Sequence, residues 1–145
     1  MSTTYISDGY TARGYIREAR GQHGSLRFTY RPVLAKNRSA ILKLVRETDS
    51  AQEQEGILAQ TIAKHVESWD LKDEHGNALP VELATAERLQ PTVFSRCFRI
   101  IIGDLPSDED AEQESQEVEA TVEEKLARAL EDKPPVPSEQ EQEGN

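Results

Sequence analysis

The alternation of apolar and polar residues near the start of the chain predicts a two-stranded hairpin. In the stretch LRFTY, Leu26, Phe28 and Tyr30 alternate with polar residues, which is the period of a strand buried on one face. A partner strand is expected at residues 14–19, and the two glycines of the link RGQHGS favour an antiparallel turn between the strands. Pro32 should end the second strand.

Apolar residues spaced by three and four predict a first helix at about residues 33–48. Its apolar face consists of Leu34, Ile41, Leu42 and Val45. A second helix is expected at residues 51–69, because Ser50 followed by Glu53 has the chemistry of a capping box. The apolar stripe of this second helix consists of Leu58, Ile62, Val66 and Trp69. We expect the two helices to form an antiparallel pair, with Gly56 weakening the first turns of the second one.

The helical period stops after Trp69, and residues 70–81 have the composition of a tight turn. Gly76 easily adopts a positive φ, and Pro80 biases its predecessor away from helix. We expect a short hairpin or compact loop here, anchored by the large, half-polar Trp69 side chain.

Two more helices are predicted before the composition changes. Thr85 should cap a short helix at residues 86–90, and Pro91 suits the first turn of a helix at residues 92–102 that ends at Gly103. The expected core consists of Leu26, Phe28, Tyr30, Ile41, Val45, Leu58, Ile62, Val66, Trp69, Phe94, Phe98 and Ile101.

Charge divides the 145 residues into two parts. Residues 1–103 carry 14 Lys and Arg against 12 Asp and Glu, whereas residues 104–145 carry 3 against 15, which gives the net charge of −10. We therefore predict an α+β domain at 1–103, with an N-terminal β-hairpin packed against three to four helices, and a largely disordered acidic tail at 104–145. A helix at about 111–131 within the tail would carry the candidate partner-binding residues Val118, Val122, Leu126 and Leu130.

The sequence contains no grouping of residues typical of catalysis or metal binding. His23, His65 and His75 lie in different predicted elements without metal-ligand spacing, and Cys97 lies on an apolar helical face. We expect no enzyme, no cofactor and no metal. One cysteine fits a reducing compartment, and no apolar run suggests a signal peptide or a membrane span, so a cytoplasmic protein is expected.

Five arginines gather on the predicted hairpin: Arg13, Arg17, Arg20, Arg27 and Arg31. They are candidates for contact with nucleic acid or with the acidic tail. The domain has a net charge of only about +2, so a solvated sheet face is favoured and no nucleic-acid partner is expected.

The order of these segments resembles a known family. The motif WDLKDEHGNALPVE has a Trp followed by Asp, Gly and Pro, and after it come a short helix at 84–89 and a last apolar helix. With the compact helical core, this resembles the tail assembly chaperones of long-tailed bacteriophages. The opening DGYTARGYIREARGQHGSLRFTYRPVL is similar to the N-terminal hairpin of some phage proteins of that group. The likeness covers residues 8–104.

The resemblance implies a non-enzymatic protein that binds the tape-measure protein, keeps it soluble in the host cytoplasm and recruits tail-tube proteins during virion assembly. Two alternatives stay open: a structural or adaptor protein of the phage virion, and an acidic DNA mimic or inhibitor with carboxylates fixed on an ordered surface. Homo-oligomerisation stays open as well, and no membrane partner is expected.

Overall fold

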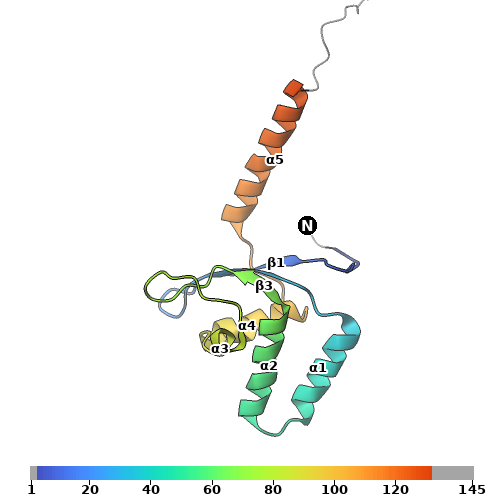
Figure 1. Ribbon diagram of the computed structural model, residues 1–145, viewed down its shortest axis with the longest axis vertical. Helices are drawn as coiled ribbons and strands as arrows, with labels where there is room; N and C mark the ends of the chain where they lie inside the picture. Colours follow the sequence, from blue (N-terminus) through green and yellow to red (C-terminus); the bar gives the residue numbers. More distant parts are fainter. Residues whose placement is uncertain (1–2, 132–145) are drawn as a thin grey trace, which may run out of the picture. The chain divides into compact units, whose positions relative to one another are not determined.

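The chain forms two units, Met1–Glu109 and Asp110–Asn145. The computed structural model describes residues 3–131, except for the side chains of residues 113–121 and 131. The first unit is an α+β domain with a three-stranded antiparallel sheet and the helices α1 to α4, and the described part of the second unit contains the helix α5 (Figure 1). The predicted α+β class and N-terminal hairpin are confirmed.

The sheet has the strand order β1-β2-β3. Its strands are β1 at Ala12–Ile16, β2 at Leu26–Tyr30 and β3 at Val66–Trp69. β1 begins two residues earlier than the sequence suggests, and in its register Gly14 faces Phe28 while Ile16 faces Leu26. Leu26 and Phe28 are buried, which confirms the predicted alternation. A Cβ at Gly14 would overlap the Phe28 ring, so only glycine fits at this position.

The helices α1 (Ala35–Glu47) and α2 (Ala51–His65) run antiparallel side by side, as predicted (Figure 1). The Ser50 hydroxyl accepts a hydrogen bond from the Glu53 N–H at 3.3 Å, which confirms the expected cap. The Gln54 side chain then joins the two helices, because its Nε2 donates to the carbonyls of Val45 at 3.0 Å and Thr48 at 2.8 Å.

The prediction of one helix through Trp69 is wrong. α2 ends at His65, and residues Val66–Trp69 form β3 against β2, where Phe28 faces Trp69. Arg31 binds the two carbonyl groups at the end of α2. Its N–H donates to the His65 carbonyl at 2.8 Å, and its Nη2 donates to the Lys64 carbonyl at 2.7 Å. Strand pairing then satisfies the backbone that a longer helix would have satisfied internally.

The expected compact loop after Trp69 is present. Lys72 and Ala78 form an antiparallel bridge, and Gly76 between them has a φ of 82°. The Trp69 Nε1–H donates to the Leu79 carbonyl at 2.9 Å, which anchors the loop to the sheet as predicted.

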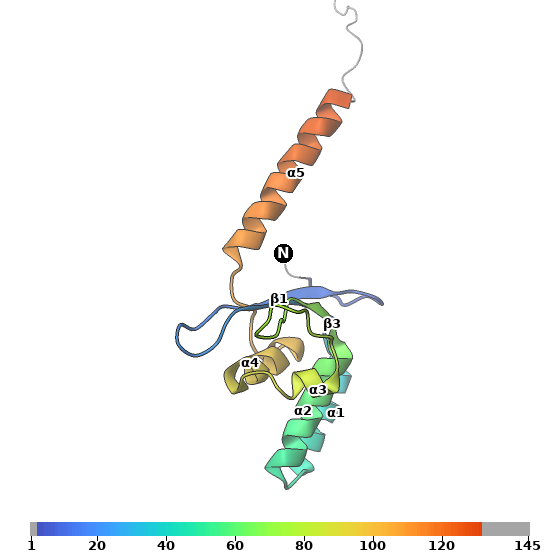
Figure 2. The ribbon, with the colours of Figure 1, turned by 60° about the vertical axis from the view of Figure 1, so that its left-hand side comes forward.

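The two following helices are α3 (Leu83–Ala86) and α4 (Pro91–Ile101). The expected cap at Thr85 is wrong, because Thr85 lies inside α3 and Glu82 occupies the cap position without a side-chain bond. α4 begins at Pro91 as expected, and the chain after it turns at Gly103 with a φ of 81°. Figures 1 and 2 show α1 to α4 on one side of the sheet.

The core lies between the sheet and these helices. Of the predicted core residues, six are buried: Leu26, Phe28, Ile62, Val66, Phe98 and Ile101. Five others are half-buried and pack against that core: Tyr30, Ile41, Leu58, Trp69 and Phe94. Val45 does not join the core, because α1 contacts the rest of the domain chiefly through α2 and has no buried residue.

A short segment after α4 continues the first unit to Glu109, past the expected boundary at Gly103. Ser107 Oγ accepts from the Tyr15 N–H at 2.7 Å, and the Asp108 N–H donates to the Tyr15 carbonyl at 2.9 Å. One Asp108 carboxylate oxygen accepts from the Arg17 N–H, and the other accepts from Arg96 Nη2, both at 2.8 Å. This segment therefore covers part of the outer edge of β1.

The helix α5 spans Ala111–Glu131, which matches the helix expected within the acidic tail. The acidic tail predicted to be largely disordered spans residues 104–145. Ser107 and Asp108 are bonded to the first unit and residues 111–131 are helical, while residues 132–145 lie outside the described residues. Among the described helices, none is both long enough and apolar enough to cross a membrane.

Candidate partner-binding site

The sequence-predicted binding residues all lie on α5. Val122, Leu126 and Leu130 recur at intervals of four on one face, and their side chains are 58%, 60% and 68% exposed. Val118 belongs to the same helix and the same interval, but its side chain lies outside the description. The helix thus presents an exposed apolar stripe among its many glutamates.

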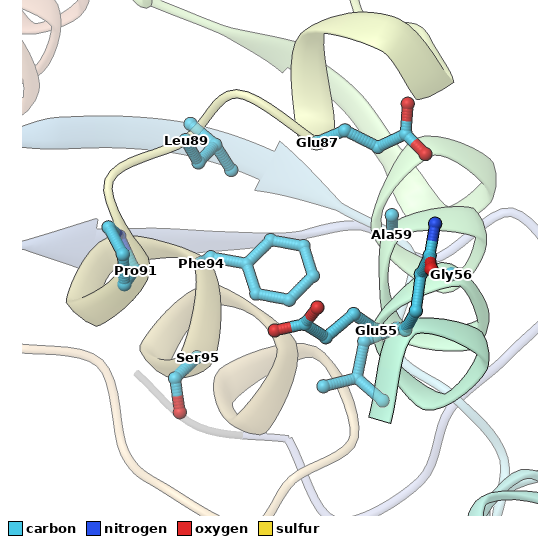
Figure 3. A pocket seen from close by; sticks show the side chains of 10 residues that line it. Glu55, Gly56, Ala59, Glu87, Leu89, Pro91, Phe94 and Ser95 are labelled. Carbon is cyan, nitrogen blue, oxygen red and sulfur yellow. The ribbon is translucent and has the colours of Figure 1, made fainter. Parts of the chain in front are cut away.

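A second candidate site, which the sequence did not predict, is a groove of about 440 Å³ in the first unit. One wall comes from α2, and the other comes from the corner between α3 and α4 (Figure 3). The groove is lined by Gln52, Glu55, Gly56, Leu58, Ala59, Glu87, Leu89, Pro91, Phe94 and Ser95. Its apolar lining is typical of sites that bind an apolar group.

The corner between α3 and α4 positions the aromatic wall of the groove. The Gln90 side-chain oxygen accepts from the Thr92 N–H at 2.8 Å and the Val93 N–H at 3.3 Å, so it caps the start of α4. Phe94 lies one turn further along, and its ring points toward α2 and is only half-buried (Figure 3). The cap and Pro91 therefore fix the direction in which Phe94 enters the groove.

Gly56 contributes no side chain to the opposite wall of the groove, which is formed by α2. It lies inside α2, where glycine is about 1 kcal/mol less favourable than alanine. It is not among the glycines with positive φ, and a Cβ there would meet nothing within 4 Å. Neither backbone conformation nor packing within the described chain explains this glycine, and its effect is to leave the groove wall free of a side chain.

Two carboxylates flank the gap between the Phe94 ring and α2. Figure 3 shows the Glu87 side chain at one end of this gap and the Glu55 side chain at the other. Both residues are exposed, and neither has an ion-pair partner among the side chains that the structure describes. The site therefore combines an apolar interior with unneutralised negative charge at its rim.

The arginines of the hairpin lie in a different environment. Arg27 is 3.8 Å from the Asp70 carboxylate, and its guanidinium lies 4.9 Å from the centre of the Tyr15 ring. Arg31 forms a 3.0 Å ion pair with Glu67. The positive charges of Arg27 and Arg31 are thus balanced by acidic residues on or next to β3.

The histidines and the cysteine lie in different elements of the first unit. The His65 imidazole contacts the Arg31 carbonyl at 2.9 Å through Nδ1, and burial lowers the pKa of this histidine below its ordinary value. Burial raises the pKa of the Cys97 thiol to about 12. His23 and His75 lie on two separate loops, whereas His65 ends α2. Within the described residues, no three His, Cys, Asp or Glu side chains gather as a metal-binding group.

No protein-family model, no curated protein and no solved structure matches this chain. The features of the chain that bear on its function are therefore the groove, the α5 stripe and the family resemblance.

Sequence reasoning missed the groove because its walls come from segments about thirty residues apart. One signal was present: Gly56 interrupts a predicted helix without marking its end. A glycine at such a position indicates either a close backbone approach or a space kept free.

Proposed function

We propose that this protein is a phage tail assembly chaperone that binds the tape-measure protein and keeps it soluble in the host cytoplasm during tail assembly. The observation that carries the proposal is the groove between α2 and the α3–α4 corner, with its apolar lining and acidic rim. The exposed stripe of α5 offers a second apolar surface for the same task. The family resemblance supplies the identity of the partners.

A chaperone of this kind prevents aggregation by covering exposed apolar surface. A long protein with unassembled apolar helices aggregates through those surfaces, so a small protein that covers them keeps it dispersed. Burying one Leu-sized side chain contributes about 1.5 to 3 kcal/mol, which is enough for reversible binding when several such contacts combine. The net charge of −10 would give the complex the repulsion that keeps it in solution.

Co-expression tests this function. Produced together with a tape-measure protein from the same genome, the chain should move that protein from the insoluble to the soluble fraction and co-purify with it. Tail-tube protein should join the complex, and finished virions should lack the chain. Stoichiometric presence in purified particles would instead identify a structural or adaptor protein, and failure to bind any tail component would refute the proposal.

A control separates the two apolar surfaces. Replacing Val118, Val122, Leu126 and Leu130 with Ser removes the α5 stripe and leaves the first unit unchanged. A loss of solubilisation in this variant would assign the partner to α5, whereas retained solubilisation would assign it to the first unit.

A further inference from the structure

We infer that the groove beside Gly56 receives an apolar side chain of a partner helix that carries Lys or Arg about one turn to either side. This inference rests on the proposed function for the identity of the partner, the tape-measure protein. The chemistry of the recognised segment comes from the groove itself.

The first step is the shape of the site. Gly56 and Ala59 leave part of the α2 wall without bulky side chains, between the larger Glu55 and Leu58. The Phe94 ring forms the facing wall (Figure 3). Nothing lies within 4 Å of a Cβ built on Gly56, so the missing side chain is not replaced by another part of the described chain. The space next to Gly56 therefore fits one inserted apolar side chain from outside.

The second step is charge. Glu55 and Glu87 stand at the two ends of the gap, and neither is neutralised within the described residues. Residues three or four apart on a helix lie on the same face, so a partner with Lys or Arg one turn before and after its apolar residue presents a matching pattern. A partner flanked by Glu would place like charges together and be excluded.

The same charges argue against the chain's own α5 as the occupant. α5 carries seven glutamates against one Lys and one Arg, so its stripe would bring more negative charge to an already acidic rim. A second copy offers an alternative through α1, where Leu44 is 52% exposed beside Lys43. Groove-dependent self-association of the chain is therefore an outcome that the test must distinguish.

The test uses the full chain and two fluorescent peptides of about 18 residues, long enough to form helices in water. Both peptides carry the same Leu stripe, flanked by Lys in one and by Glu in the other. In fluorescence anisotropy, the Lys-flanked peptide should bind at least about tenfold more tightly than its twin. Raising NaCl from about 0.1 M to about 1 M should reduce this preference, because it shortens the Debye length from about 10 Å to about 3 Å.

Two variants locate the binding. Gly56→Leu fills the space with a side chain and should weaken the Lys-flanked peptide more than about tenfold. The matched control Ala40→Leu adds the same side chain at an exposed position of α1 and should leave affinity unchanged. The double variant Glu55→Lys with Glu87→Lys keeps the apolar walls and should reverse the preference toward the Glu-flanked peptide.

Several results would overturn the inference. They are equal binding of the two peptides, no binding of either, unchanged binding by Gly56→Leu, or concentration-dependent self-association that Gly56→Leu abolishes. If Gly56→Leu lowers the thermal midpoint, its peptide affinity is set aside and the inference is judged from the peptide preference of the variant with Glu55→Lys and Glu87→Lys.

The inference and the proposed function can fail separately. If Gly56→Leu still solubilises the tape-measure protein, this inference is refuted and the proposed function stands. Peptide binding without any solubilisation refutes the function and leaves the groove's specificity standing.

Discussion

The indole of Trp69 is hydrogen-bonded to the backbone of Leu79, with 2.9 Å between Nε1 and the carbonyl oxygen. Trp69 is the last residue of β3 and packs against the core, while Leu79 lies on the returning side of the loop at residues 70–81. A second bond, from the Leu79 N–H to the Leu71 carbonyl at 3.0 Å, closes the loop on itself. One side chain thus joins the loop to the sheet by both packing and a hydrogen bond.

Replacing Trp69 should separate these two contributions. Trp69→Phe keeps most of the packing and loses the hydrogen bond, which should cost about 1 kcal/mol of unfolding free energy. Trp69→Ala also loses the ring and should cost about 3 kcal/mol, the low end for a large aromatic because the side chain is only half-buried. Chemical denaturation followed by circular dichroism measures both values. Equal stabilities of the parent and both variants, with tryptophan fluorescence typical of full exposure in the parent, would contradict the anchoring role.

The segment along β1 predicts different outcomes for two truncations. A chain ending at Glu109 keeps Ser107 and Asp108 on the strand edge and should retain the thermal midpoint of the parent within a few degrees. A chain ending at Gly103 loses these bonds to Tyr15 and Arg17 and should melt at a clearly lower temperature. Calorimetry of the two truncated chains tests this. Identical midpoints would show that the segment adds no stability.

Asp108 should make stability depend on pH. The hydrogen bond from the Arg96 guanidinium, with the Arg17 N–H adding to it, holds the pKa of Asp108 below its ordinary value of 3.8. Because the folded pKa is depressed, the stabilisation is present above pH 3.8 and is lost as pH falls through the folded value. The free-energy difference between the parent and Asp108→Asn should therefore be constant at neutral pH and shrink in more acidic buffers. Urea titrations at a series of pH values measure it, and a difference independent of pH would remove Asp108 as the cause.

Two glycines should respond in opposite directions to alanine. Gly56→Ala adds a methyl group to open space inside α2 and should raise stability by about 0.5 to 1 kcal/mol. Gly14→Ala forces a methyl group into the Phe28 ring and should lower stability by about 1 to 3 kcal/mol. Thermal melts of the two variants under one set of conditions test the pair. Destabilisation by Gly56→Ala would show that its wall of the groove is more crowded than the structure indicates.

The sequence by itself determined the elements whose signals are local. The alternation at Leu26, Phe28 and Tyr30 specifies a strand, because a period of two places every second side chain on one face. Ser50 and Pro91 specify helix starts through the geometry of the first turn, and Gly76 and Gly103 specify turns through positive φ. Such signals need only a few neighbouring residues, so they can be predicted without knowledge of the fold.

Val66 and Trp69 show where local signals become ambiguous. Their spacing continues the helical stripe of Leu58 and Ile62, and in a regular strand residues three apart would lie on opposite faces. A register shift between β2 and β3 pairs Val66 with Tyr30 and Trp69 with Phe28. Two sets of contacts favour the strand over a longer helix. The backbone of β2 pairs with β3, and Arg31 donates hydrogen bonds to the carbonyls of Lys64 and His65. Only the tertiary structure could decide this, because the competing hydrogen bonds come from residues more than thirty positions away.

Of the two candidate partner-binding surfaces, one could be predicted from local sequence and the other could not. The stripe of Val122, Leu126 and Leu130 could be predicted, because a helix places residues four apart on one face. The groove could not, since the gap between Gly56 and Phe94 exists only once α2 and α4 pack beside each other. Sequence periodicity specifies which face of each helix turns inward, but the space left between two faces depends on the distance and angle at which the helices pack.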